Sequence, residues 1–308
     1  MKRTFGITGF LLLAVLSLSM LLVGCGSDSE KESVVRKNHE VAVTPKDSSK
    51  KARYKVYLIT MDLGSNFWQQ IDAGCKEAVE EMGDIEYHWT APNNHNAKEQ
   101  AECIDKAVAD GANAIVLSAV SATELNGTLE AADKAGVKLV YVDSAATYNA
   151  VATLETDNEV AGRAAADAMK QALSERGIVN GTIGIAAMSR TQNANERDKG
   201  FREGLAGSGF VVAPTAYLDN DRANIKRFVR EHPDYVGFFG SNGQTTFAIG
   251  DVLRDTGARP VFIAFDTADA TLAMIKDDIA YATLQQNPQR MGHDGLRIAV
   301  DALDGKFT

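Results

Sequence analysis

Residues 54–82 read YKVYLITMDLGSNFWQQIDAGCKEAVEEM, a strand pattern followed at once by a helix pattern. Residues 54–60 form a short, mostly apolar run rich in aromatic and β-branched side chains, which predicts a buried strand. From Phe67, apolar or small residues recur at i, i+4, i+7, i+8, i+11, i+12 and i+15, the spacing of a helix that buries one face. A strand that leads directly into such a helix is the repeating unit of a parallel α/β sheet.

The same alternation continues towards the C-terminus in two successive sets. Further strand patterns lie at 85–89, 114–119, 138–143 and 151–154, and a second set lies at 182–187, 210–217, 235–240, 260–265 and 280–284. Helical patterns lie at 97–108, 121–135, 159–173, 195–205, 221–231, 245–256, 268–277 and 289–303. Sets of about five strands are typical of separate sheets. We therefore predict an α/β protein of two Rossmann-like lobes, each with a parallel sheet between helices, joined by a hinge.

The first 25 residues have the pattern of an export signal. Lys2 and Arg3 precede an apolar run that ends in Leu22-Val23-Gly24-Cys25, and the sequence then becomes polar at once. This resembles a bacterial lipobox, in which the cysteine is lipidated and becomes the new N-terminus. An ordinary signal peptide or a short transmembrane anchor are the alternatives. We expect residues 1–24 to be a lipoprotein signal peptide and Cys25 to carry the lipid, which places the rest of the chain on the extracytoplasmic face of the cell membrane.

Charge and composition limit the classes of function. Hydrophobic residues make up 45% of the chain and charged residues 24%, which are values of a globular protein. Without Lys2 and Arg3, 30 basic residues remain against 41 acidic ones, a net charge of −11. A chain this acidic is expected to repel nucleic acid. Residues 25–53 are polar and without apolar periodicity, so we predict a lipid anchor followed by a flexible tether.

The cysteines and histidines give no sign of a metal site or a disulfide. The five histidines lack metal-ligand spacing, so we expect neither a metal nor another cofactor. In an exported protein Cys75 and Cys103 could pair. In a right-handed sheet of strand order 2-1-3-4-5, however, their two helices lie on opposite faces, which predicts two buried free thiols.

Polar and aromatic residues follow the predicted strands at the ends where ligands bind in parallel α/β sheets. The side chains comprise carboxylates, amides, a guanidinium and an aromatic pair. Planar polar groups can each engage two hydroxyls, and aromatic rings pack on the C–H faces of a sugar. A phosphate ligand would instead call for a glycine-rich loop or several cations, and neither is present. The pattern favours an uncharged polyol.

Residues 54–308 resemble the periplasmic sugar-binding proteins of the ribose/galactose type, which serve ABC importers. The resemblance rests on motifs in the order of that family: Phe67-Trp68 before Gly74, Tyr141-Val142-Asp143-Ser144, Thr156-Asp157-Asn158 before Gly162, Arg197 before Gly200-Phe201, Ser241-Asn242, Ala264-Phe265-Asp266, and Ala282-Thr283-Leu284-Gln285-Gln286. It implies that the type I periplasmic-binding-protein fold divides the chain into an N-terminal lobe, 54–156 plus 287–308, and a C-terminal lobe, 157–286.

The resemblance also implies a role for each ligand residue. Phe67 and Trp68 would stack on the sugar ring, Arg197 would bond its ring oxygen or a hydroxyl, and the remaining positions would bond hydroxyls; these are Asp143, Asn242, Asp266 and Gln286. Each residue also has a structural alternative. The aromatic pair could belong to the helix core, the aspartates could cap helices, Arg197 could form a surface ion pair, and Asn242 could serve a turn.

Three departures from the family pattern bear on the ligand and on the end of the chain. Ser144 stands where ribose binders have an arginine, and Asn66 stands where a proline often precedes the aromatic pair, which puts ribose itself in doubt. The family also continues into another crossing strand beyond the last helix, whereas this sequence stops at Thr308.

The function that the resemblance implies is capture of a monosaccharide or related polyol between the lobes, hinge closure, and delivery to the membrane permease subunits of an ABC transporter. We expect a monomer without catalytic activity. A receptor that senses a sugar or autoinducer and signals through a membrane partner would use the same pocket. An exported hydrolase is a further alternative, with Asp143 and Asp266 as its carboxylate pair. A DNA-binding regulator is disfavoured, because a leader stands where its helix-turn-helix would be.

Overall fold

The computed structural model describes residues 41–43, 52–218 and 221–306. The predicted leader, 1–24, and the predicted lipidation site, Cys25, lie outside these ranges. Within the described ranges, no helix combines the length and apolarity needed to cross a bilayer.

The first sheet has the strand order β1-β3-β2-β4-β5-β6, and all of its pairs are parallel except that of β1 with β3. Its strands are β1 (Val41–Val43), β2 (Tyr54–Ile59), β3 (Ile85–Thr90), β4 (Ala114–Leu117), β5 (Lys138–Val142) and β6 (Ala152–Leu154). Apart from β1, this is the predicted order 2-1-3-4-5.

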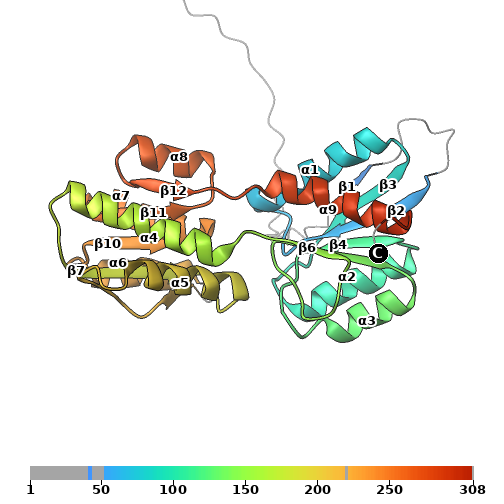
Figure 1. Cartoon of the computed structure of the whole chain (residues 1–308), viewed down its shortest axis with the longest axis horizontal. Coiled ribbons are helices and arrows are strands. Elements are labelled where there is room, and N and C mark those ends of the chain that lie inside the picture. The colour runs from blue at the N-terminus through green and yellow to red at the C-terminus, as the bar shows by residue number, and fades with distance from the viewer. Residues whose placement is uncertain (1–40, 44–51, 219–220, 307–308) are drawn as a thin grey trace, which may run out of the picture. The chain divides into compact units, whose positions relative to one another are not determined.

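The second sheet repeats this order as β12-β11-β10-β7-β8, with β9 paired to β7. Its strands are β7 (Gly181–Ala187), β8 (Phe210–Val212), β9 (Ala216–Tyr217), β10 (Gly237–Gly240), β11 (Val261–Phe265) and β12 (Ala282–Leu284). The two sets of strands and the doubly wound α/β class agree with the sequence prediction (Figure 1).

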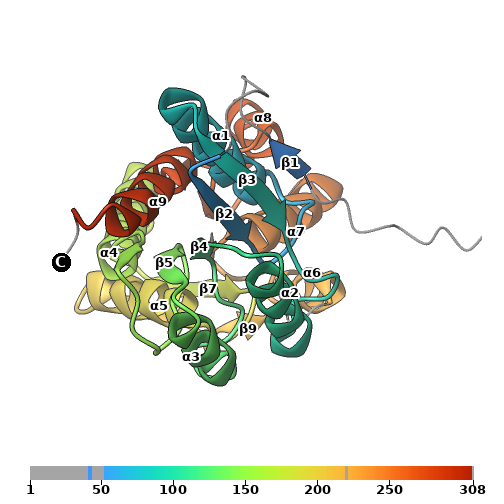
Figure 2. The ribbon, with the colours of Figure 1, turned by 90° about the vertical axis from the view of Figure 1, so that its right-hand side faces the viewer.

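Helices cover both faces of each sheet. They are α1 (Asn66–Met82), α2 (Ala97–Ala109), α3 (Asn126–Lys134), α4 (Asn158–Glu175), α5 (Gln192–Leu205), α6 (Arg222–Glu231), α7 (Gly243–Thr256), α8 (Asp269–Lys276) and α9 (Pro288–Leu303). Figure 2 shows α1 and α9 on one side of the first sheet and α2 and α3 on the other. On the second sheet, α4 and α5 share one core, and α6, α7 and α8 share the other.

The cysteine prediction is confirmed. Cys75 packs in the core between the first sheet and α1, whereas Cys103 packs in the core on the opposite face. Both are buried free thiols. The sheet separates them, as the strand order requires.

Three elements differ from the predicted pattern. Strand β1 lies inside the predicted tether, where the short Val-Ala-Val run pairs antiparallel with the edge strand β3. The predicted strand 210–217 is divided into β8 and β9, because Pro214 between them has no N–H for a ladder. Helix α3 begins five residues later than predicted, because the Ser121 hydroxyl accepts the Thr123 and Glu124 amides and forms a local turn.

Candidate ligand-binding site

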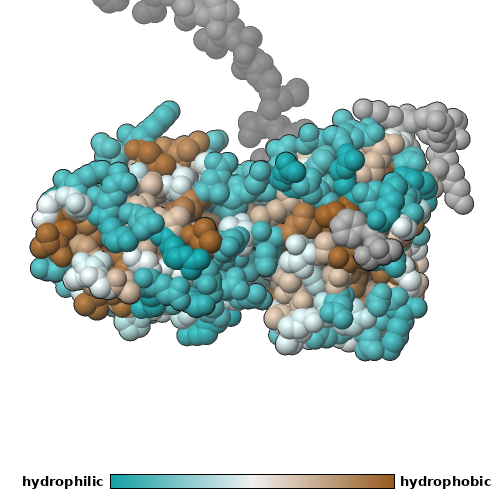
Figure 3. Space-filling view, viewed as in Figure 1, coloured by the Kyte–Doolittle hydropathy of each residue, from teal (hydrophilic) through white to brown (hydrophobic). Residues whose placement is uncertain are grey.

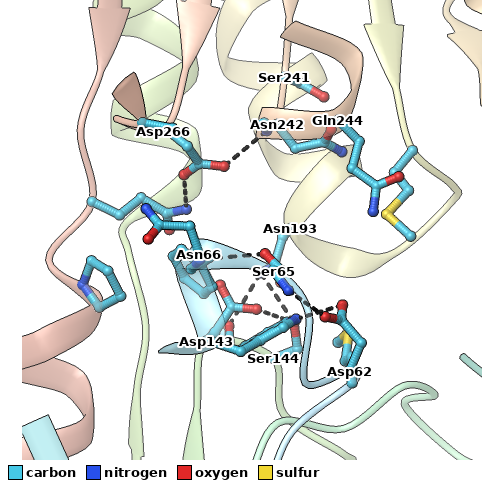
Figure 4. Close-up of a pocket in the computed structure, with 18 of the residues that line it drawn as sticks. Asp62, Ser65, Asn66, Asp143, Ser144, Asn193, Ser241, Asn242, Gln244 and Asp266 are labelled. Atoms are coloured by element: carbon cyan, nitrogen blue, oxygen red, sulfur yellow. Dashed lines mark hydrogen bonds between the residues drawn. The ribbon is translucent and has the colours of Figure 1, made fainter. Parts of the chain in front are cut away.

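A cavity of about 570 Å³ lies at the carboxyl ends of strands from both sheets. Parallel strands direct the loops that follow them to the same edge, so residues far apart in sequence meet there. All seven residues predicted to contact ligand line this cavity: Phe67, Trp68, Asp143, Arg197, Asn242, Asp266 and Gln286. Figure 4 shows Asp143 and Ser144 across the cavity from Asp266, Ser241 and Asn242.

Two of the carboxylates occupy matching positions in the two sheets. Asp143 directly follows β5 and Asp266 directly follows β11, the fourth strand of the repeated order in each case. Both have left-handed backbones, with φ of 64° and 67°. Each backbone N–H donates at 2.8 Å to the last residue of the neighbouring strand, Leu154 for Asp143 and Leu284 for Asp266.

Asp143 is a buried carboxylate, 8% exposed, whose described side-chain hydrogen bond comes from the Ser144 hydroxyl at 2.7 Å. Burial raises its pKa, and the positive charge of Arg197 opposes part of that rise. The Asn193 amide donates at 3.2 Å both to the backbone oxygen of Asp143 and to the Ser144 hydroxyl. Because a buried charge is costly unless well paired, Asp143 would be stabilised by a ligand that brings further donors.

Asp266 accepts hydrogen bonds from two residues that follow strands of its own sheet, Gly243 after β10 and Gln286 after β12. The Gly243 amide donates to one carboxylate oxygen at 2.9 Å, and the Gln286 amide donates to the other at 2.8 Å. Helix α8, which follows, has Ala268 at its N-cap and no side-chain cap. Asp266 is therefore not the helix cap that the structural alternative required, and Asp143 is followed by β6 rather than by a helix.

Arg197 is buried, with 5% of its surface exposed, and is not part of a surface ion pair. Its guanidinium donates to the side chain of Asn158 at 2.8 Å, to the backbone oxygen of Ser241 at 2.8 Å and to Gln286 at 3.1 Å. It also lies 4.0 Å from the ring centre of Phe265. Burial lowers its pKa, which the nearby carboxylates partly counter. Three of its five N–H groups are used in these bonds, so two remain for a ligand.

Gln286 connects the site to the segments between the sheets. Its side-chain oxygen accepts from Thr156 at 2.7 Å and from Arg197, while its nitrogen donates to Asp266.

Asn242 has a structural role and also lines the cavity. Its side-chain oxygen caps α7 by accepting the Thr245 amide at 2.9 Å. The same residue lies in the cavity wall, where a ligand contact is predicted.

The aromatic pair, Phe67 and Trp68, belongs both to the packing around α1 and to the wall of the cavity. Trp68 is 6% exposed and belongs to the core beneath α1, while Phe67 packs against that core in a half-buried position. Their rings meet edge to face, with centres 4.9 Å apart and planes at 83°. Both residues line the cavity.

Comparison with known proteins identifies the family. Residues 56–307 match the model of the periplasmic binding protein domain. The chain belongs to this family. The ribose import binding protein RbsB of Bacillus subtilis (strain 168) is 25% identical over 267 residues, which are 85% of this chain and 86% of that protein. The D-ribose/D-allose-binding protein of Pseudomonas aeruginosa is 20% identical over 265 residues, 82% of this chain and 83% of that protein.

Solved structures of periplasmic binding proteins share the fold. An ABC transporter solute-binding protein from Burkholderia graminis, in complex with D-arabinose, is 26% identical with a TM-score of 0.78, and the match covers 84% of this chain and 92% of that one. A carbohydrate transporter solute-binding protein from Agrobacterium radiobacter, also with D-arabinose, is 25% identical with a TM-score of 0.77 over 84% and 91% of the two chains.

The cavity of this periplasmic binding protein also has lining residues that sequence patterns did not single out. His95 lies in the loop after β3, so its place beyond a strand end was a signal that could have found it, whereas Phe247 lies within α7, where no strand end signals a site. Asn193, near the start of α5, also lines the cavity. Thr267, which also lines the cavity, and Ser241 of the predicted Ser241-Asn242 motif carry hydroxyl oxygens that are buried and without a hydrogen-bond partner among the described residues.

Proposed function

We propose that the protein captures a monosaccharide or related polyol in this cavity and delivers it to the permease subunits of an ABC importer. The observation that carries the proposal is the composition of the cavity wall. Carboxylates, amides and a buried guanidinium from both sheets share one cavity with an aromatic pair. The solute-binding relatives crystallised with D-arabinose, a pentose, support a ligand of monosaccharide size.

The proposed mechanism is closure of two lobes about the segments that connect the sheets. The lobes comprise 54–156 plus 287–308, and 157–286. A ligand that bonds Asp143 in one lobe and Asp266 and Arg197 in the other would stabilise the closed arrangement through contacts that only this arrangement makes. The permease would recognise that arrangement. We propose no catalytic step, because the chain belongs to a family of binding proteins.

The remaining parts of the proposal concern the state of the protein in the cell. Lipidation at Cys25 would anchor it to the extracytoplasmic face of the membrane, and residues 25–53 would connect the lobes to the lipid. We also propose that the protein is a monomer; the face shown in Figure 3 is mostly hydrophilic, with apolar areas between the polar ones. Exposed large apolar residues in the described ranges are Val160, Val179, Val211 and Leu272.

Thermal unfolding of the purified protein with a panel of pentoses, hexoses and alditols tests the proposal. A ligand at a hundred times its dissociation constant should stabilise the fold by about 2.7 kcal/mol. Titration calorimetry with the sugars, and incubation with glycosides followed by recovery of the unchanged glycoside, would then separate binding from hydrolysis. Absence of any shift across the panel, or release of a converted product, would contradict the proposal.

A further inference from the structure

The cavity has a third carboxylate, Asp62, whose oxygens are both engaged within the protein. One oxygen accepts the backbone amides of Gly64 and Ser65 at 2.8 Å and 2.7 Å. The other accepts the indole N–H of Trp68 at 3.1 Å and lies 3.3 Å from the Nε2 atom of His95. Asp62 is therefore placed to hold other groups rather than to receive a ligand hydroxyl.

These contacts join two loops that are distant in sequence. Asp62 lies between β2 and α1, whereas His95 lies between β3 and α2. Burial alone would raise the pKa of Asp62, but the hydrogen bonds from His95 and from two backbone amides outweigh it and lower that pKa. Asp62 is thus kept as an anion, which is a strong acceptor for the indole N–H.

The orientation of the indole sets the shape of the aromatic surface that Phe67 and Trp68 present to the cavity. Trp68 has one polar atom, Nε1, and that atom is bonded to Asp62. The ring of Phe67 stands at 83° to the indole. The two rings therefore form a corner, and the bond to Asp62 restrains the rotation of the indole.

We propose that Asp62 is a positioning residue that holds the Phe67–Trp68 corner, and that this corner makes the site select ring-closed sugars over acyclic polyols. The inference rests on the proposed function and narrows its ligand class. A closed sugar ring presents a preformed C–H face to a fixed aromatic corner. An open alditol has no such face until its carbon chain is ordered, and that ordering costs binding free energy.

The test compares D-arabinose with D-arabitol, and D-ribose with ribitol, by titration calorimetry on the full folded chain. We expect the unaltered protein to bind the better sugar at least about tenfold more tightly than its alditol, a difference of about 1.4 kcal/mol. Asp62→Ala should weaken the sugar about tenfold and the alditol much less, so that the preference falls to within about threefold.

A double-mutant cycle separates positioning from a general loss of stability. Trp68→Phe keeps an aromatic ring but removes the indole N–H that bonds Asp62. The effects of Asp62→Ala and Trp68→Phe on sugar affinity should therefore be strongly non-additive. Asp62→Leu keeps the approximate size of the side chain, removes both acceptor oxygens and should lose the preference in the same way, so it provides a second variant if the alanine variant fails to fold.

Asp221→Ala is the matched control. Asp221 also accepts a backbone amide at a loop-helix boundary, at 2.8 Å from Ala223, but it does not line the cavity. Its removal should lower the unfolding temperature without changing the ratio of sugar to alditol affinity.

The outcomes distinguish this inference from the proposed function. A protein that binds sugar and alditol equally well, or an Asp62 variant that keeps the full preference, would overturn the inference while sugar binding stands. Additive effects in the cycle would overturn the positioning role. Binding of no member of the whole panel of pentoses, hexoses and alditols would remove the proposed function and this inference together.

Discussion

Thr156 donates a hydrogen bond of 2.7 Å to the side-chain oxygen of Gln286, although 130 residues separate them in sequence. Thr156 lies between β6 and α4, and Gln286 lies between β12 and α9. These are two segments that pass from one sheet to the other. The bond therefore ties the connections together at the point where Gln286 also contacts Arg197 and Asp266.

Gln286→Leu should weaken sugar binding by at least about tenfold, because it leaves three polar groups without their partner. Thr156→Val removes only one of these bonds and should have a smaller effect. Calorimetric titration of both variants with the tightest sugar of the panel checks the order. Equal affinity in Gln286→Leu and in the unaltered protein would show that the contact is irrelevant to binding.

Asp266→Ala should abolish the thermal shift produced by sugar while the protein remains folded. The backbone of Asp266 has φ of 67°, a region that asparagine tolerates better than alanine. Asp266→Asn therefore serves as the control for backbone strain, and it should keep more of the unliganded stability but still bind weakly. Scanning calorimetry with and without sugar measures both effects. A full shift in the alanine variant would refute the assignment of Asp266 to the site.

Gly200→Ala should destabilise the fold by about 2–4 kcal/mol, because a Cβ at this position would collide with the backbone of Glu159 where α4 and α5 cross. Gly127→Ala is the matched control, since a Cβ there meets nothing within 4 Å in helix α3. That change should be neutral or slightly stabilising. Urea unfolding of both variants provides the measurement, and equal midpoints would disprove the close helix contact.

His293 should contribute stability that depends on pH. Its ring hydrogen-bonds Asp294 on its own helix at 2.9 Å and faces Glu81 of α1 at 3.3 Å, and these contacts raise the pKa of His293. Arg297 pairs with Glu81 and Arg290 pairs with Asp294, so the two carboxylates also have other cationic partners. These pairs limit the stability that a charged His293 adds. Because the folded-state pKa is raised, the contribution is complete below the unfolded pKa of about 6.5 and disappears as the pH rises through the folded value.

The expected size is below about 1 kcal/mol, since the group is partly exposed. The free energy of unfolding of His293→Gln, relative to the unaltered protein, should therefore be lower at pH 5.5 and approach the same value by about pH 8.5. A difference that stays constant over this interval would contradict the expected role of the imidazolium.

The repeating parts of this fold were accessible from the sequence, because alternating strand and helix patterns are local. The strand order 2-1-3-4-5 was taken from the doubly wound class of fold, and together with right-handed connections it correctly separated Cys75 from Cys103. Strand β1 was missed because three residues carry too little pattern, and its pairing with β3 is a long-range contact. Pro214, by contrast, was a visible reason to divide the strand 210–217.

The gathering of the seven predicted residues around one cavity could be anticipated, because each follows a strand end or begins a helix near one. The sequence could not show how these residues hold one another. The three bonds of Arg197 and the link from His95 to Asp62 join loops that meet only after folding. Whether each predicted residue contacts a sugar stays a prediction for the variants above.

Asp143 and Asp266 share a strand position, a left-handed backbone and a bond to the neighbouring strand. The two halves of the fold therefore correspond point by point at this position. This correspondence has a practical use in protein engineering. When one aspartate is altered to change ligand preference, the same substitution at the other aspartate serves as an internal control. It distinguishes a loss of affinity caused by the backbone geometry that both positions share from a loss caused by the altered side chain.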